Sequence, residues 1–148
     1  MSYSAALSDL DRDGDADLIV SHLDDRVDIY RNDTQGGNRL LVELKGSGAN
    51  PYAVGARIQV SAPGWSSTHQ LFPNEGFNSS DDPVLCVPMG RHTSASMKVL
   101  WPGGRESAVT GIPANSWITV SEDESSGSKI APAGVSENPN AAVGATEA

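Results

Sequence analysis

Residues 40–64 read LLVELKGSGANPYAVGARIQVSAPG and contain two short strand-like runs separated by turn residues. The first run is Leu40–Leu44, and the second, Ala56–Val60, alternates apolar and polar side chains. Gly, Ser, Asn and Pro fill the stretch between them, and Pro63-Gly64 ends the second run. A period of two bounded by such residues predicts neighbouring β-strands joined by turns.

The same pattern continues towards the C-terminus, and no window has a sustained helical period. Trp101-Pro102-Gly103-Gly104-Arg105 suits a tight hairpin, because Pro presets φ and Gly tolerates positive φ. The sequence therefore predicts an all-β fold, a small antiparallel β-sandwich or barrel-like domain. Further strands are expected at residues 67–72, 84–87, 97–101, 107–109 and 117–120.

Composition divides the 148-residue chain into three zones. Residues 1–34 hold an acidic loop and two strand-like runs, 18–20 and 27–30, which predict a β-hairpin with the loop at its entrance. Residues 35–122 are expected to form the β domain. Residues 123–148 are rich in Ser, Gly, Pro, Ala and Glu, so we expect a disordered tail.

The acidic loop places carboxylates at alternate positions, with Asp9, Asp11 and Asp13 at loop positions 1, 3 and 5. Gly14 follows where a sharp turn is needed, Asp15 is expected to give its backbone carbonyl, and Asp17 closes the site directly or through water. This pattern predicts a Ca²⁺ site, because calcium takes six to eight oxygen ligands in irregular geometry. The alternative is a solvated acidic turn without a metal, and Mg²⁺ fits less well because it demands octahedral geometry.

Position 12 of the loop decides its structural context. An EF-hand needs a bidentate Glu there, whereas this chain has Val20 inside a strand-like run. The predicted metal site therefore belongs to a β-hairpin.

Two resemblances follow from these motifs. Residues 7–32, with the Asp9–Asp17 loop and the run 27–32, resemble a calcium-binding FG-GAP/VCBS repeat of integrin-like β-propellers. Residues 38–122 resemble the ASPIC/UnbV domain through Asn38–Val42, Asn50–Ile58, Gly76–Pro83 and Val99–Arg105. In place of the family's usual aromatic-Gly-Leu-Gly run, this chain has Val87-Pro88-Met89-Gly90. The resemblance implies an extracytoplasmic, calcium-binding, adhesion-like protein and supplies no catalytic residues. One blade cannot close a ring, so further blades are expected upstream.

Other candidate sites are weaker. His22, His69 and His92 lack metal-ligand spacing, and no G-x-S-x-G motif suggests a hydrolase. The lone Cys86 excludes an internal disulfide and is expected to pack within a strand. A polar loop contains Asn74, Glu75, Asn78, Ser80, Asp81 and Asp82, which are expected to form turns and Asx-type hydrogen bonds. The alternative is a second binding site at this loop.

Charge and targeting signals narrow the function further. A net charge of −9 disfavours nucleic-acid binding, and no apolar run of transmembrane length occurs. Residues 1–4 lack a secretory signal, so either the protein is cytosolic or this chain is the C-terminal piece of a longer exported protein. The resemblance implies the second, with a location outside the cell, on its surface or in the periplasm. The favoured function is a non-enzymatic adhesion or binding module for an extracellular protein or glycan. The alternative is an accessory domain of an exported enzyme whose catalytic part lies upstream.

Overall fold

The computed structural model describes residues 2–11, 15–33, 36–72, 80–123 and 129–132. The described residues form eleven strands in three sheets and no helix, which confirms the predicted all-β class. Among them, therefore, no helix is long and apolar enough to cross a membrane.

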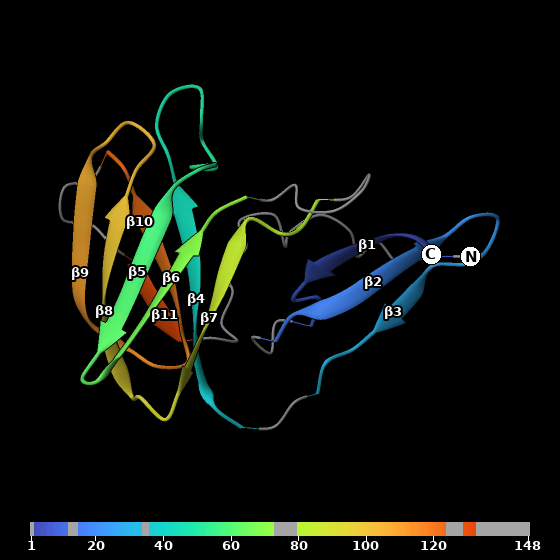
Figure 1. Cartoon of the computed structure of the whole chain (residues 1–148), viewed down its shortest axis with the longest axis horizontal. Helices are drawn as coiled ribbons and strands as arrows, with labels where there is room; N and C mark the ends of the chain where they lie inside the picture. The colour runs from blue at the N-terminus through green and yellow to red at the C-terminus, as the bar shows by residue number, and fades with distance from the viewer. Residues whose placement is uncertain (1, 12–14, 34–35, 73–79, 124–128, 133–148) are drawn as a thin grey trace, which may run out of the picture.

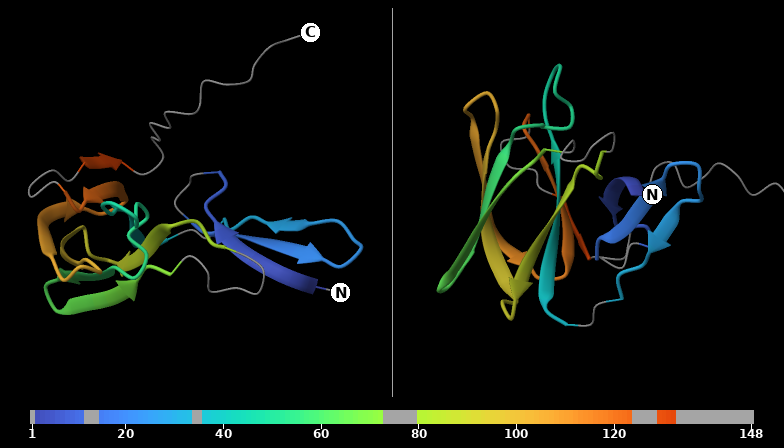
Figure 2. Two further views of the ribbon diagram at one scale, coloured as in Figure 1. Left: turned by 90° about the horizontal axis from the view of Figure 1, so that it is seen from above. Right: turned by 45° about the vertical axis from the view of Figure 1, so that its right-hand side comes forward.

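Residues 38–72, 80–123 and 129–132 build a β-sandwich (Figures 1 and 2). One sheet has the order β11-β10-β4-β7, and the other has the order β6-β5-β8-β9. The first contains β4 (Asn38–Lys45), β7 (Val84–Gly90), β10 (Ser116–Ser121) and β11 (Lys129–Pro132). The second contains β5 (Arg57–Ala62), β6 (Trp65–Gln70), β8 (Ser94–Leu100) and β9 (Glu106–Pro113).

The core lies between these two sheets because each strand turns alternate side chains inward. In β10, for example, Ser116, Ile118 and Val120 are buried while the residues between them are only partly so. The largest core side chain is Trp101, which is 1% exposed and donates its indole N–H to Ser107 Oγ at 2.9 Å. The core residues are Leu40, Val42, Leu44, Ala53, Ala56, Ile58, Val60, Leu71, Val87, Met89, Ala95, Met97, Val99, Trp101, Ile112, Ile118 and Val120.

The turn predicted after β8 forms as expected. Trp101 N–H donates to the Arg105 carbonyl and Gly104 N–H to the Trp101 carbonyl, both at 2.9 Å, and Gly104 takes a φ of +83°. This positive φ is the conformation for which glycine was expected.

Two strand features were not predicted. β10 pairs in parallel with β4, whereas the other strand pairs are antiparallel. β7 continues through Pro88 to Gly90, and Pro88 lies opposite Arg39. An edge strand tolerates Pro because one side of its backbone needs no ladder partner. The departure from the family pattern at residues 87–90 therefore leaves β7 paired with β4, but with a register shift between Pro88 and Gly90.

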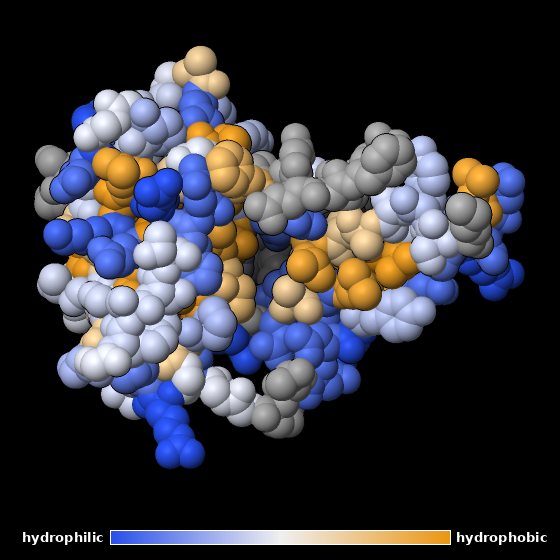
Figure 3. Space-filling model, in the orientation of Figure 1, coloured by the Kyte–Doolittle hydropathy of each residue, from blue (hydrophilic) through white to orange (hydrophobic). Residues whose placement is uncertain are grey.

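A separate three-stranded sheet lies beside the sandwich (Figures 1 and 2). Its strands are β1 (Ser2–Ser8), β2 (Asp17–His22) and β3 (Asp28–Tyr30), in antiparallel order β1-β2-β3. The predicted hairpin is β2–β3, and β1 is an additional strand. Leu7, Leu18 and Tyr30 lie opposite one another across this sheet and are 47%, 37% and 57% exposed. Figure 3 shows apolar side chains gathered over the visible face of this part of the molecule.

The segment expected to be a disordered tail, residues 123–148, contains the short strand β11, which pairs with β10 at residues 116–119. Residues 124–128 and 133–148 lie outside the described residues.

Candidate metal centre

The acidic loop connects β1 to β2 and brings three carboxylates together. One carboxylate oxygen from each of Asp9, Asp11 and Asp17 lies within 4.8 Å of the others. Asp17 opens β2 and is buried, Asp9 is half-buried, and Asp11 is exposed. Asp13, expected to contribute from the same loop, lies outside the described residues.

Asp17 also holds the local structure in place. Its Oδ2 accepts a hydrogen bond from Leu10 N–H and its Oδ1 accepts one from Asn32 N–H, both at 2.9 Å. These two backbone donors lower the pKa of the Asp17 carboxyl from its ordinary value, with the Asn32 bond contributing most. Asp17 is therefore an anchored anion that fixes the end of the loop against the segment after β3.

A positive side chain lies beside the three carboxylates. Arg31 Nη1 is 3.5 Å from Asp11 Oδ2, and the same guanidinium also pairs with Asp33. Both arginine contacts are solvent-exposed, so they offset little of the repulsion among the carboxylates.

The Asp15 side chain turns away from this group and towards the sandwich. Its Oδ1 lies 2.8 Å from Nη1 of Arg39, which is at the start of β4. Because the sequence assigned Asp15 to the site through its backbone carbonyl, this side-chain pairing is compatible with that expectation. Arg39 itself was missed, since nothing local in the sequence indicates that β4 would meet the loop.

The donor set is made only of carboxylate oxygens, with no nitrogen or sulfur ligand. Hard, oxygen-seeking cations prefer such donors, and calcium accepts them in irregular arrangements. In the described part of the chain, no group of three metal-ligating side chains includes a histidine or Cys86. The three convergent aspartates therefore fit a calcium ion better than zinc or a redox metal.

Comparison with known families concerns mainly the sandwich. The family model "ASPIC and UnbV" matches residues 46–127, more than half of the 148 residues. The chain belongs to the ASPIC and UnbV family. Domains of this family are typically C-terminal accessory regions of exported proteins. No curated protein matches the chain.

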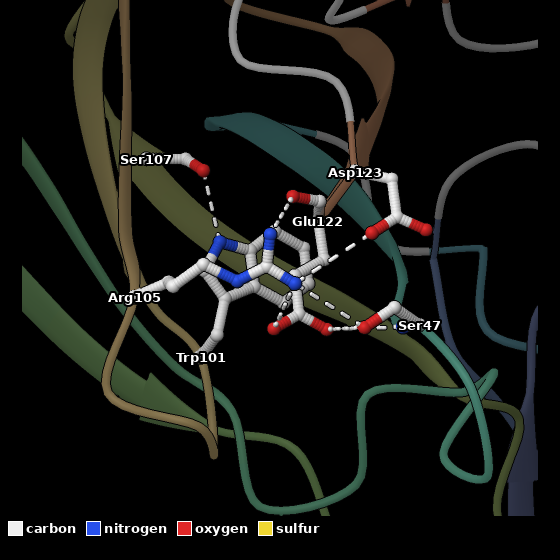
Figure 4. A network of polar contacts seen from close by, with 6 residues as sticks. All are labelled: Ser47, Trp101, Arg105, Ser107, Glu122 and Asp123. Atoms are coloured by element: carbon white, nitrogen blue, oxygen red, sulfur yellow. Dashed lines mark hydrogen bonds and ion pairs between the residues drawn. The ribbon is translucent and has the colours of Figure 1, made fainter.

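Within the ASPIC/UnbV domain, a polar network ties three loops together (Figure 4). Glu122, just after β10, accepts hydrogen bonds from Ser47 N–H at 3.0 Å and Ser47 Oγ at 2.8 Å. Arg105, from the β8–β9 turn, lies 3.3 Å from Glu122 Oε1. The Ser47 bonds, followed by the Arg105 charge, lower the pKa of Glu122. This network stabilises the end of the domain at which β4, β8 and β10 finish.

The polar loop singled out as a second site contacts the chain itself. Leu7 N–H donates to Asp81 Oδ1 at 2.8 Å, and Asp82 N–H donates to the Leu7 carbonyl at 3.2 Å. Ser8 Oγ–H also donates to Asp82 Oδ2 at 3.5 Å. The described end of this loop, from Ser80, therefore attaches β1 to the ASPIC/UnbV domain, while Asn74, Glu75 and Asn78 lie outside the described residues.

Among the residues that the structure describes, Cys86 and the histidines do not come together in one metal-binding group. Cys86 is exposed on β7 rather than packed in the core, which corrects the expectation from its apolar neighbours. Desolvation by the surrounding residues raises the pKa of its thiol; the Arg39 charge opposes this effect, and the charges of Asp15 and Asp9 add to it. His69 shares a 2.7 Å hydrogen bond with Ser67, and the His92 ring stacks on Trp65 with centroids 5.4 Å apart.

Proposed function

We propose that this chain is a calcium-binding, non-catalytic binding module of an exported protein. The observation that carries this proposal is the convergence of Asp9, Asp11 and Asp17 at the junction of two strands. An all-carboxylate group of this kind suits calcium, and a bound cation would offset the mutual repulsion of the three charges. The resemblance of residues 7–32 to an FG-GAP/VCBS repeat supports the same interpretation.

Calcium would steady the small sheet rather than take part in a reaction. The carboxylates of Asp9, Asp11 and Asp17 would hold the ion, with Asp13 as a further ligand and Asp15 contributing its carbonyl. A three-stranded sheet with exposed apolar residues on β1, β2 and β3 has little core of its own. Metal binding at its β1–β2 loop would therefore supply stability that packing does not.

The proposed ligand of the module is an extracellular protein or glycan. Two exposed aromatic residues of the ASPIC/UnbV domain support a binding role: Tyr52 is 62% exposed and Phe72 is 46% exposed. Both lie outside the regular strands, where loops on a rigid scaffold commonly carry recognition. The export typical of the family supports an extracellular or periplasmic location.

The test is thermal unfolding in excess Ca²⁺ and in EGTA, followed by far-UV circular dichroism. Calcium at about a hundred times its Kd should stabilise the folded state by about 2.7 kcal/mol. Asp11→Asn should remove most of this gain because it deletes a charged ligand. Asp24→Asn is the matched control: it removes the same charge in the β2–β3 turn, at a φ of +60° that Asn adopts readily. Identical melting of the wild type in calcium and in EGTA would refute the proposal.

A further inference from the structure

The small sheet is attached to the ASPIC/UnbV domain at two places, which together we call the joint. On one side, Asp15 of the acidic loop pairs with Arg39 of β4 at 2.8 Å. On the other side, Leu7 of β1 exchanges hydrogen bonds with Asp81 and Asp82. Both attachments lie within a few residues of the acidic trio Asp9, Asp11 and Asp17.

The Asp15–Arg39 pair is the better shielded of the charged contacts near the loop. The side chains of Asp15 and Arg39 are 15% and 23% exposed, whereas those of Asp11 and Arg31 are 34% and 63% exposed. Reduced exposure strengthens an ion pair, because less water screens it. The Asp15–Arg39 pair is also the one that crosses the joint, whereas Asp11 and Arg31 both belong to the part of the chain that carries the small sheet.

Arg39 is a fixed point of the sandwich. Its N–H donates to Asn115 Oδ1 at 3.1 Å, and its carbonyl accepts from Asn115 N–H at 2.7 Å. Its neighbour Asn38 donates to the His92 carbonyl at 2.9 Å. These hydrogen bonds hold the backbone of Arg39 in place. Whether its guanidinium pairs with Asp15 therefore depends on where the acidic loop places the Asp15 carboxylate.

Asp15 lies between two of the three carboxylates along the chain, two residues before Asp17 and four after Asp11. The carboxylates of Asp9, Asp11 and Asp17 repel one another at short range, and a bound cation would offset that repulsion. A cation would therefore favour the arrangement in which the trio converges and the Asp15 side chain faces Arg39.

We infer that the Asp15–Arg39 pair is a latch through which cation binding in the loop docks the small sheet onto the ASPIC/UnbV domain. This inference rests on the proposed calcium site. Coupling between two binding events is reciprocal, so pairing with Arg39 must strengthen cation binding by the same factor by which the cation strengthens docking. Arg39 acts as a positioning residue, and its positive charge never touches the ion.

For Arg39→Gln, the latch and simple electrostatics predict changes in calcium affinity of opposite sign. If Arg39 acted only as a nearby positive charge, Arg39→Gln would remove a repulsion and tighten calcium binding. If it is a latch, Arg39→Gln removes the ion pair that holds the Asp15 side chain and weakens calcium binding by about five-fold or more, which is a typical coupling. Asp15→Asn should weaken binding to a similar extent, and the double variant should bind no more weakly than either single variant.

The experiment is isothermal titration of CaCl₂ into the wild type, Arg39→Gln, Asp15→Asn and the double variant. Weaker and non-additive binding in the variants supports the latch. Unchanged or tighter binding in Arg39→Gln overturns the latch and leaves the calcium site standing. No binding by the wild type overturns both. Asp15→Asn also removes a negative charge near the cation, so the decisive comparison is Arg39→Gln with the wild type. Arg39→Lys keeps the positive charge but not the guanidinium, and it replaces Arg39→Gln in the comparison should that variant fail to fold.

Hydrogen exchange provides a second measurement at the far side of the joint. The amides of Leu7 and Asp82 donate across it, so their exchange should slow in calcium relative to EGTA. In Arg39→Gln, saturating calcium should no longer slow them. Equal protection of these two amides in the wild type and in Arg39→Gln would overturn the latch.

Discussion

Two isoleucines test whether the molecule has one well-packed core and one open sheet. Ile118 on β10 is fully buried and lies opposite Val42 of β4. Ile29 on β3 is 63% exposed and pairs with Ile19. Truncating each to Ala removes the same atoms, so the difference in unfolding free energy measures burial alone.

The magnitude of the Ile118→Ala effect follows from its burial. The substitution removes about three methylene equivalents, which are worth about 2.4 kcal/mol at about 0.8 kcal/mol each. Incomplete collapse of the core around the cavity adds to this, so the expected loss is about 2–5 kcal/mol. In a domain of this size, that corresponds to a fall in Tm of roughly 10 °C or more. Ile29→Ala should cost less than about 1 kcal/mol.

The assay is urea unfolding of both variants, followed by far-UV circular dichroism and extrapolated to zero denaturant. A small loss for Ile118→Ala would refute the packed sandwich core. A loss for Ile29→Ala as large as that for Ile118→Ala would show that the β1–β3 sheet is covered in solution.

Two further predictions concern the network in Figure 4. Ser107→Ala leaves the indole N–H of Trp101, a residue only 1% exposed, without its acceptor, and should cost about 1–3 kcal/mol in urea unfolding; no loss would mean that this hydrogen bond contributes nothing. Glu122 has a lowered pKa, so the stability that it contributes is complete above its ordinary pKa of 4.5 and is lost as pH falls through the lower folded value. Melting temperatures between pH 7 and pH 2 should therefore fall less steeply in Glu122→Gln, and parallel curves for the two proteins would contradict this assignment.

Local sequence signals predicted most of the sandwich. Strand alternation and turn residues depend on neighbours along the chain, so the runs at residues 40–44, 56–60 and 117–120 became β4, β5 and β10 with small changes at their ends. β1 was missed because Ser2–Ser8 contains mostly Ser and Ala, which give no apolar alternation. β11 was missed because its segment has the composition of a tail, and it exists only by pairing with β10.

The candidate site was also predicted in part. Spacing alone selected Asp9, Asp11 and Asp17, since a short loop must curl alternate carboxylates towards one point. The same spacing could not show that the Asp15 side chain faces Arg39, a residue distant in sequence. Nor could it show that Asp81 and Asp82 would bind β1 rather than an external ligand.

The sequence by itself determined an all-β chain with an acidic loop of alternating carboxylates, because strand alternation, turn chemistry and the spacing of the aspartates are all written in consecutive residues. Only the tertiary structure decided the parallel pairing of β4 with β10 and the meeting of the loop with Arg39. These features join segments far apart along the chain, and their energy comes from contacts that form only after the sheets have packed.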